Sequence, residues 1–370
     1  MIIMETPRHV EISITSRCNL NCKYCYHFDS DADVDDELPL HEWLLFFKEL
    51  KKNSVLSVTI QGGEPFIRKD LKEILAGIVN NDMRFSILSN GTMLNDDIAS
   101  YIASTKRCRF VQISIDGSAP EIHDKCRGEG SFSKSIKSIQ ILKKYKIPIS
   151  VRVTINKLNV YDIENITKYL IKSINLKGFS INSASYLGRC KSPENNIQLS
   201  IEERSFVMKK LLDLNKKYND CISASAGPLA DVHQWTRMIR EKNSNTITSK
   251  NSGKLCGCGG VLSKIAIRAD GQITPCILLS HITLGRINSV DLKSIWLNNE
   301  RLKFLRGIRN ISLSDFAFCK DCEYIPWCTG NCPAISYSII GKEAHPDPEA
   351  CLKRFLQNGG RVPTIHETEY

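Results

Sequence analysis

The sequence predicts an α/β fold in which parallel strands alternate with helices, followed by a cysteine-rich region. From the start of the chain to about residue 185, short β-rich runs alternate with helical stretches. Eight cysteines then gather between Cys256 and Cys351. Alternating strands and helices favour a parallel sheet with right-handed crossovers. The alternation leaves open whether this sheet closes into a partial (β/α)6 barrel or stays open and doubly wound.

The composition narrows the function classes. The 370 residues carry a net charge of +10, but the basic residues are scattered among acidic ones, so a nucleic-acid partner is not expected. No run approaches the ~20 apolar residues of a membrane span, and the first residues lack a signal-peptide pattern. We therefore expect a cytoplasmic protein without a membrane partner. The 15 cysteines cluster at metal-like spacings, which favours metal ligation over disulfides.

Six strands and five helices are expected in the first part of the chain. In either sheet architecture, functional groups belong at the carboxyl ends of the strands, and the motifs described below follow strands. The predicted strands span residues 9–14, 56–60, 84–88, 109–115, 149–155 and 178–182, and the predicted helices span residues 40–52, 70–79, 96–103, 131–145 and 160–171.

The first motif is a three-cysteine loop directly after the first strand. Cys18, Cys22 and Cys25 are spaced Cys-x3-Cys-x2-Cys, which can place three thiolates on three irons of a cubic iron–sulfur cluster. The fourth iron would stay open for a substrate or cofactor. The alternative is a zinc knuckle with His27 as the fourth ligand, although zinc sites usually come as two separated cysteine pairs.

Several short motifs follow the later strands. Gln61-Gly62-Gly63-Glu64-Pro65 contains two glycines that let the backbone approach a ligand closely, and their carbonyls can accept from an ammonium group. The other motifs are Ser89-Asn90-Gly91, Ser114-Ile115-Asp116-Gly117, the stretch from Asp124 to Gly130 with Arg127, Arg152 on the fifth strand, and Tyr186-Leu187-Gly188-Arg189. Taken alone, each is also compatible with an ordinary turn or a surface charge.

The middle of the chain begins with an amphipathic helix over residues 200–218. Ser200 and Glu203 are spaced as in a capping box. Periodicity is lost over residues 219–254, which predicts a linker or a mobile substrate-facing loop. The expected domains are 1–218, a linker or bridging region 219–254, a cysteine-rich domain 255–356, and a frayed tail 357–370.

The cysteine-rich domain begins with an expected hairpin. The alternating run 264–274 contains an Asp270-Gly271 turn, and cysteines lie at both ends of this region. Eight cysteines are enough for two sites with four ligands each; two structural zinc sites are the alternative. The cysteines that match no motif and are expected to be ordinary are Cys108, Cys126, Cys190 and Cys221.

The three-cysteine loop, with Tyr24 before its last cysteine, resembles the signature of the radical S-adenosylmethionine (SAM) enzymes. The resemblance implies a partial (β/α)6 barrel and a 4Fe-4S cluster on Cys18, Cys22 and Cys25. In that family the open iron chelates SAM, and an electron cleaves it to a 5′-deoxyadenosyl radical that abstracts a hydrogen. The implied SAM contacts are Tyr24, Gly62, Gly63, Glu64, Ser89, Asn90, Ser114, Asp116, Arg127, Arg152 and Leu187.

The second group of cysteines resembles the SPASM extension, a twin-cluster domain found on radical SAM enzymes that mature peptides and proteins. The resemblance implies an outer 4Fe-4S cluster on Cys319, Cys322, Cys328 and Cys351, and an inner one on Cys256, Cys258, Cys276 and Cys332. That makes three clusters in all. Cys256 and Cys258 are closer than usual, and if only one of them ligates, the inner cluster has an open iron facing the substrate.

The resemblance implies an oxidative modification, such as a crosslink, of a ribosomally made precursor peptide. The overall residue pattern of the chain is similar to that of maturases of the SynChlorMet type. Expected partners are the peptide and an electron donor such as flavodoxin or ferredoxin. Because the cysteine loop begins at residue 18 and leaves no winged-helix module ahead of it, leader recognition is expected to need either a separate leader-recognition protein or the barrel's own surface.

Three alternatives stay open at this point. They are an anaerobic sulfatase maturase that makes formylglycine, a tetrapyrrole or other small-molecule enzyme, and an iron–sulfur electron carrier without enzyme activity. The sequence identifies neither the bond that is made nor a general base. His281 and the acids near Cys276 are candidates that no spacing singles out.

Overall fold

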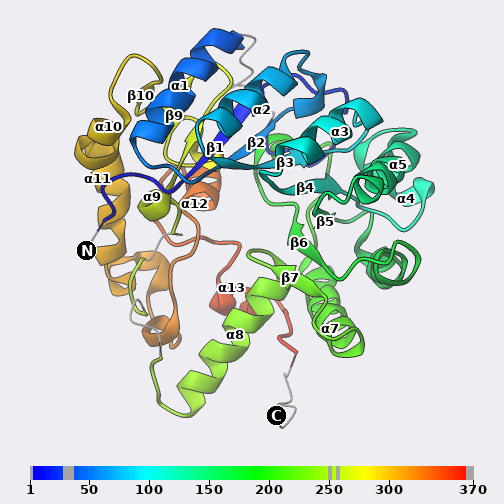
Figure 1. Ribbon diagram of the computed structural model, residues 1–370. Helices are drawn as coiled ribbons and strands as arrows, with labels where there is room; N and C mark the ends of the chain where they lie inside the picture. Colours follow the sequence, from blue (N-terminus) through cyan, green and yellow to red (C-terminus); the bar gives the residue numbers. More distant parts are fainter. Residues whose placement is uncertain (1–2, 28–36, 249–251, 256–258, 364–370) are drawn as a thin grey trace. The chain divides into compact units, whose positions relative to one another are not determined.

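The computed structural model describes residues 3–27, 37–248, 252–255 and 259–363. Figure 1 labels the helices and strands of the chain. By their internal contacts they divide into two compact units. Unit 1 comprises residues 1–115, 127–151 and 259–306, and unit 2 comprises residues 116–126, 152–258 and 307–370. Each unit therefore joins segments that are far apart in the sequence. In the described part of the chain, no helix combines the length and apolar character needed to cross a membrane.

Unit 1 is built on a mostly parallel sheet with the strand order β10-β9-β8-β1-β2-β3-β4. Only the β8-β9 and β9-β10 pairs are antiparallel. The strands are β1 (His9–Thr15), β2 (Ser57–Gly62), β3 (Arg84–Ser89), β4 (Cys108–Ser114), β8 (Lys264–Ile267), β9 (Gln272–Thr274) and β10 (Gly285–Arg286). Its helices are α1 (Leu40–Lys52), α2 (Leu71–Asn80), α3 (Asp96–Thr105), α5 (Ser131–Lys144), α9 (Gly260–Ser263), α10 (Leu292–Asn298) and α11 (Glu300–Gly307), whose last residue falls in unit 2.

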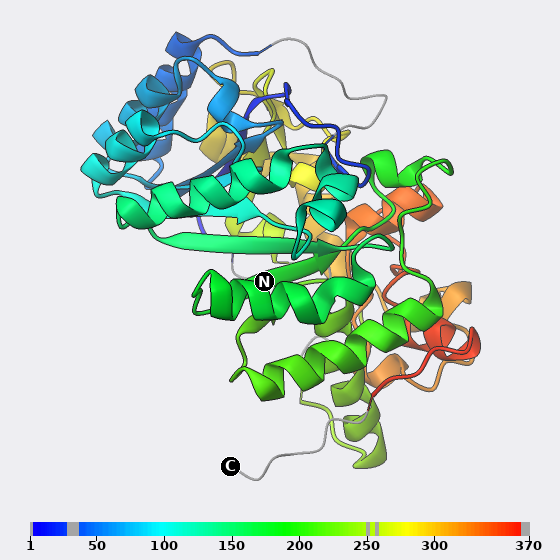
Figure 2. The ribbon, with the colours of Figure 1, turned by 90° about the vertical axis from the view of Figure 1, so that its right-hand side faces the viewer.

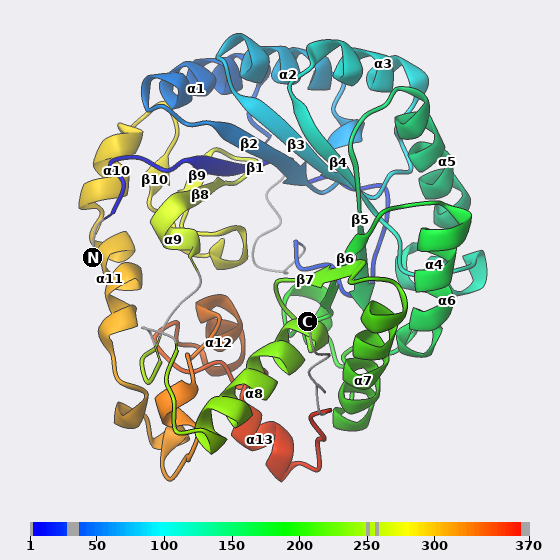
Figure 3. The ribbon, with the colours of Figure 1, turned by 60° about the horizontal axis from the view of Figure 1, so that its bottom comes forward.

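The sheet and its helices form because apolar residues follow the matching periods. Ile12 of β1 pairs with Ile60 of β2, and both are fully buried. Trp43, Phe46 and Leu50 make the buried stripe of α1. Figure 3 shows α1, α2 and α3 side by side along β1–β4. The predicted α/β fold with a parallel sheet is confirmed, and so is the antiparallel hairpin of β8 and β9.

Unit 2 contains the parallel strands β5 (Ile149–Ile155, from Arg152 onward), β6 (Phe179–Ser183) and β7 (Ile222–Ala224), drawn in green in Figure 2. Helix α7 begins with the predicted capping box, in which Ser200 and Glu203 bond each other's backbone N–H groups. The helices are α4 (Pro120–Arg127, whose last residue falls in unit 1), α6 (Ile163–Lys168), α7 (Ile201–Lys217), α8 (Pro228–Asn243), α12 (Pro333–Ile340) and α13 (Leu352–Gln357).

The structure differs from the expectation over residues 219–254. Instead of a linker or a loop, the described part of this segment contains β7 and the 16-residue helix α8. Trp235 and Val232 on α8 are fully buried. Apolar contacts of this kind supply most of the stability of a helix in a folded protein, which explains why α8 is ordered.

Candidate functional site

The three-cysteine loop leaves the carboxyl end of β1 in unit 1. Cys22 is buried, whereas Cys18 and Cys25 are half-buried. The backbone N–H of Cys25 donates to the carbonyl of Cys22 at 3.2 Å, which closes a tight turn between these two ligand positions. Three thiols therefore lie on one short loop at the strand end where parallel sheets carry their functional groups.

The Gly62-Gly63-Glu64 turn after β2 supports the segment that leads into this loop. Gly63 N donates to Thr15 O, and Glu64 N donates to Arg17 O, both at 2.9 Å. A Cβ atom added to Gly63 would lie 2.0 Å from the carbonyl oxygen of Arg17, and one added to Gly62 would lie 2.1 Å from that of Thr15. The glycines therefore allow backbone to pack on backbone, which places Cys18. A SAM contact by this turn stays a prediction.

Glu64 is the centre of a buried hydrogen-bond cluster. Its carboxylate accepts from Phe66 N at 3.1 Å, from Ser89 Oγ at 2.8 Å and from Asn90 N at 2.8 Å. Burial raises the pKa of Glu64 to about 7, and these hydrogen bonds oppose the rise. The structure thus brings Glu64, Ser89 and Asn90 together. The Glu64 carboxylate accepts from two backbone N–H groups and one side-chain hydroxyl.

Arg127 lies beside the cysteine loop. Its Nη1 atom is 4.0 Å from Cys22 Sγ, and its guanidinium carbon is 5.5 Å from the centre of the Tyr24 ring. The Cys22 thiol also donates to the carbonyl of Arg127 at 3.9 Å. A cation beside this ligand position complements the negative charge that a metal-bound thiolate carries. The motif 124–130 therefore contributes a charge to the site.

The chemistry of these residues fits an iron–sulfur cluster. Cys18, Cys22 and Cys25 provide the soft thiolates that such clusters require, with Asn90 and Arg127 next to two of them. Within the described part of the chain, no three His, Cys, Asp or Glu side chains are arranged to hold a single metal ion.

Four other predicted SAM contacts occupy varied positions. Ser114 is half-buried at the end of β4 in unit 1, whereas Asp116, Arg152 and Leu187 belong to unit 2. Asp116 is fully buried, and its Oδ1 atom accepts from the backbone N–H of Thr154 at 2.6 Å. This bond holds the carboxylate against β5. Whether these four residues contact SAM stays a prediction.

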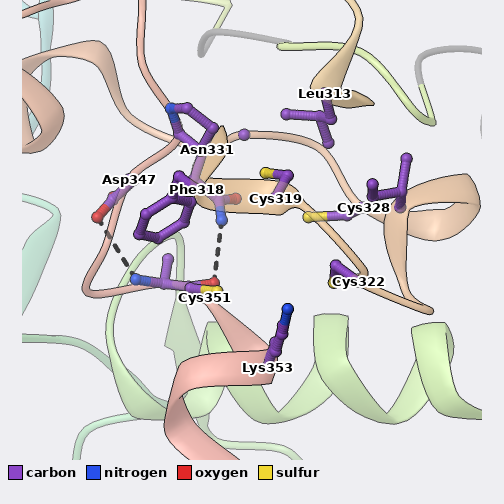
Figure 4. A pocket seen from close by; sticks show the side chains of 13 residues that line it. Leu313, Phe318, Cys319, Cys322, Cys328, Asn331, Asp347, Cys351 and Lys353 are labelled. Atoms are coloured by element: carbon purple, nitrogen blue, oxygen red, sulfur yellow. Dashed lines mark hydrogen bonds between the residues drawn. The ribbon is translucent and has the colours of Figure 1, made fainter. Parts of the chain in front are cut away.

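A second cysteine site lies in unit 2. Cys319 ends the 3-10 turn Ala317–Cys319, Cys322 and Cys328 lie in the chain that follows it, and Cys351 directly precedes α13. Figure 4 shows the four side chains around one cavity. Leu313 and Phe318 add apolar surface, and Asp347 and Lys353 add charges. The cysteines lining the cavity are Cys319, Cys322, Cys328 and Cys351, the four assigned by resemblance to the outer cluster.

The thiols of this cavity influence one another electrostatically. Burial raises the pKa of Cys328 to about 12, and the nearby thiols of Cys351, Cys319 and Cys322 add to the rise. Burial and the same kind of neighbours raise the pKa of Cys319 to about 11. Loading such a site must release protons, because thiolates are the ligands. Four converging thiols fit a 4Fe-4S cluster.

The structure describes only two of the four cysteines assigned to the inner cluster. Cys276 is half-buried after β9 in unit 1, and Cys332 is the N-cap residue of α12 in unit 2. Cys256 and Cys258 lie outside the described residues. The inner cluster therefore stays a prediction.

Sequence reasoning missed two residues that hydrogen-bond to Asn90 or to each other beside the first site. Asn19 Nδ2 donates to Thr92 Oγ1 at 2.8 Å, and Thr92 Oγ1 donates to Asn90 Oδ1 at 2.7 Å. Asn19 lies within the three-cysteine loop, and Thr92 follows Ser89-Asn90-Gly91. No local pattern joins them, because the contact depends on β1 and β3 ending at the same edge of one sheet.

Comparisons with known proteins identify two domains in the chain. Residues 12–170 match the radical SAM superfamily, and residues 256–323 match SPASM, an iron–sulfur cluster-binding domain. The chain is 26% identical to the Fe-coproporphyrin III synthase of Methanosarcina barkeri, over 92% of this chain and 87% of that protein. It is 24% identical to the antilisterial bacteriocin subtilosin biosynthesis protein AlbA of Bacillus subtilis, over 88% of this chain and 67% of AlbA.

The fold is also that of a solved structure. SuiB of Streptococcus suis, crystallised with its precursor peptide SuiA, superposes with a TM-score of 0.74 at 19% identity, over 95% of this chain and 77% of SuiB. SAM and iron–sulfur clusters are the cofactors of the two matched domains. The chain therefore carries a radical SAM domain over residues 12–170 and a SPASM iron–sulfur cluster-binding domain over residues 256–323, and it is an enzyme.

Proposed function

We propose that the protein modifies a ribosomally made peptide by radical SAM chemistry, with three 4Fe-4S clusters. The observation that carries the proposal is the pairing of two different cysteine sites. The loop of unit 1 offers three thiols, which leaves one iron of a cubic cluster for SAM. The cavity of unit 2 offers four, which suits a closed cluster that transfers electrons.

When bound, the first cluster and SAM together supply a one-electron chemistry that removes a hydrogen atom from a substrate carbon. The residues of the chain bind and orient these groups. Cys18, Cys22 and Cys25 hold the cluster, and the Gly62-Gly63-Glu64 turn fixes the backbone before them. Arg127 places a positive charge where it can attract the SAM carboxylate. Tyr24 presents a ring beside that charge.

The proposed auxiliary clusters would accept the second electron of an oxidative modification. Cys319, Cys322, Cys328 and Cys351 would hold the outer cluster. The inner cluster would use Cys276 and Cys332 with Cys256, Cys258 or both. An external donor such as flavodoxin or ferredoxin would return electrons to the first cluster.

Two observations support a peptide substrate. AlbA, which aligns with most of this chain, acts in the biosynthesis of a bacteriocin. The stretch Asp124-x2-Arg127-Gly128-x-Gly130 resembles one found in peptide-modifying members of the superfamily, and it lies against the cysteine loop. A tetrapyrrole substrate is the second candidate, because the Fe-coproporphyrin III synthase aligns over 92% of this chain.

The test offers both substrate classes to the same reconstituted enzyme. The full chain is supplied with SAM and dithionite under anaerobic conditions. It then receives either synthetic peptides encoded by short reading frames next to its gene, or an iron tetrapyrrole precursor of Fe-coproporphyrin III. The readouts are the mass of each substrate and the amount of 5′-deoxyadenosine. The Arg127→Lys variant is run in parallel, because it keeps the charge but loses the planar fork that pairs with a carboxylate.

A mass change in a peptide, with 5′-deoxyadenosine formed in proportion and less of both in Arg127→Lys, is the expected result. Loss of mass from the porphyrin with unchanged peptides would overturn the peptide proposal in favour of the tetrapyrrole one. Modification of neither class, in enzyme that still cleaves SAM, would also count against the peptide substrate.

A further inference from the structure

Asn90 lies in the loop after a strand, yet both its backbone N–H and its backbone carbonyl are hydrogen-bonded. It lies just beyond β3 and is 8% exposed. Its backbone N–H donates to Glu64 Oε2 at 2.8 Å, and its carbonyl accepts from Ser135 Oγ on α5 at 2.7 Å. These two bonds fix the backbone, so the direction of the side chain is set before any cofactor is bound.

The side chain of Asn90 belongs to a closed ring of three hydrogen bonds. Asn90 Nδ2 donates to Asn19 Oδ1 at 3.1 Å. Asn19 Nδ2 donates to Thr92 Oγ1 at 2.8 Å, and Thr92 Oγ1 donates back to Asn90 Oδ1 at 2.7 Å. Since Asn19 follows Cys18 directly, the ring joins the cysteine loop to the end of β3.

One hydrogen of the Asn90 amide is left after the ring is made. A side-chain amide carries two N–H groups, and the ring uses one of them. Asn90 Nδ2 is 3.8 Å from Cys18 Sγ, which is within reach of a hydrogen bond to sulfur. The Oδ1 atom also accepts from Thr92 N at 2.8 Å, so the amide cannot flip without losing these bonds. The amide therefore aims a donor at one ligand sulfur.

We propose that Asn90 sets the reduction potential of the cluster held by Cys18, Cys22 and Cys25, and does so as a positioning residue through the Cys18 sulfur. The proposal rests on the proposed function for the presence of that cluster. It assigns the amide of Asn90 to the cluster ligand, where the family resemblance implied a contact with SAM.

The physical basis is charge. When the cluster takes up one electron from a donor, negative charge builds up on its sulfurs. A donor fixed at a ligand sulfur stabilises that reduced form and raises the potential. Loss of one hydrogen bond to a charged group changes such an equilibrium about tenfold, which is ~59 mV for a one-electron couple.

The test measures the potential directly. Wild-type full-length protein and three variants are reconstituted with iron and sulfide and titrated with dithionite, with the reduced clusters followed by electron paramagnetic resonance. The signal that changes on addition of SAM identifies the cluster at Cys18. Asn90→Ala removes the donor, and Asn90→Asp keeps the shape but replaces the donor with a carboxylate. Thr92→Val opens the ring and leaves the Asn90 amide in place.

We expect the midpoint to become more negative by about 59 mV in Asn90→Ala and by more in Asn90→Asp, with Thr92→Val close to wild type. Iron content is measured for each sample. If Asn90→Ala fails to bind its cluster, the midpoint of Asn90→Asp is compared with that of the wild type instead. An unchanged midpoint in a fully loaded Asn90 variant would overturn the inference. An equal shift in Thr92→Val would also overturn it, because loop geometry would then explain the effect.

The same experiment distinguishes failure of the proposed function from failure of the inference about Asn90. Absence of a SAM-responsive signal in the wild-type protein would reject the proposed function, and the inference with it. A SAM-responsive signal whose midpoint is unchanged in the Asn90 variants would reject the inference but not the proposed function.

Discussion

Arg204 shows how a single residue stabilises unit 2. Its Nη2 atom donates to Asp231 Oδ2 and its Nη1 atom donates to the carbonyl of Glu349, both at 2.9 Å. Its guanidinium carbon also lies 5.4 Å from the Trp235 ring centre and 5.2 Å from that of Phe355. One side chain of α7 therefore joins α8, α13 and the segment before Cys351. The ion pair with Asp231 is largely buried, which makes loss of one partner costly.

Replacing Arg204 by alanine should destabilise the protein in a pH-dependent way. Burial raises the pKa of Asp231 to about 6, while Arg204 opposes the rise. The folded state thus binds more protons than the unfolded state between about pH 4 and pH 6, and stability falls as pH rises through that window. In Arg204→Ala, we expect a loss of about 3 kcal/mol near pH 8, where the carboxylate is charged and unpaired. The loss near pH 5 should be smaller.

Urea unfolding of the reconstituted protein at both pH values measures this difference. Arg240→Ala is the control, because Arg240 is exposed on the same helix α8. Its effect should stay within about 0.5 kcal/mol. Equal losses at both pH values for Arg204→Ala would show that Asp231 does not titrate in this range.

At the scale of elements, the turn after β2 explains why glycine is needed beside the cysteine loop. Gly63→Ala would bring a Cβ atom to 2.0 Å from the carbonyl oxygen of Arg17, and backbone atoms at that position cannot move away cheaply. The segment before Cys18 must then shift. We expect iron bound at the first site to fall by at least half and SAM cleavage to fall with it, as measured by iron analysis and 5′-deoxyadenosine release.

Gly307→Ala provides the control for this change. An added Cβ at Gly307 would meet no atom of the described residues within 4 Å, and its φ of −69° suits alanine. This variant should bind iron and cleave SAM like the wild type. Full iron and normal cleavage in Gly63→Ala would contradict the role given to the turn.

Elements with local signals were predicted from the sequence, and those without were not. Helix α7 was predicted because Ser200 and Glu203 form the spacing of a capping box at its N-terminus. Helix α8 was missed, because its N-cap is Gly227, which offers no side chain to cap the helix, and the only start signal is Pro228. Its order comes from burial of residues such as Trp235, which is a property of the tertiary fold.

The same distinction applies to the site. The cysteine loop could be predicted because its three thiols lie within eight residues. The contacts of Asn90 with Glu64 and Cys18 join residues 26 and 72 positions apart. They exist because β1, β2 and β3 are neighbours in one sheet. Strand order is set by packing across the whole unit, so no local pattern reveals these contacts.

At the scale of the whole molecule, the two described cysteine sites belong to different units. The contacts described for the three-cysteine loop come from unit 1, including those with Glu64, Asn90 and Arg127. The four-cysteine cavity is lined by residues of unit 2. Each site therefore has its own structural support, and damage to one need not dismantle the other.

Removing two outer ligands tests this independence. In the double variant Cys319→Ala with Cys322→Ala, we expect a loss of about four irons per chain, because one 4Fe-4S cluster is lost. SAM cleavage without substrate should persist, whereas modification of the peptide should fall strongly, since the second electron loses its acceptor. Iron analysis and product mass spectrometry check this. Equal loss of SAM cleavage and product would contradict independent sites.

The central proposal is that this radical SAM enzyme holds three 4Fe-4S clusters. The measurement that tests it most directly is an iron count and a 5′-deoxyadenosine assay on anaerobically reconstituted protein, comparing wild type with Cys22→Ala. We predict about twelve irons per wild-type chain, with SAM cleavage under dithionite that Cys22→Ala abolishes. Zinc in place of iron, or no SAM cleavage by fully loaded wild-type protein, would contradict the account.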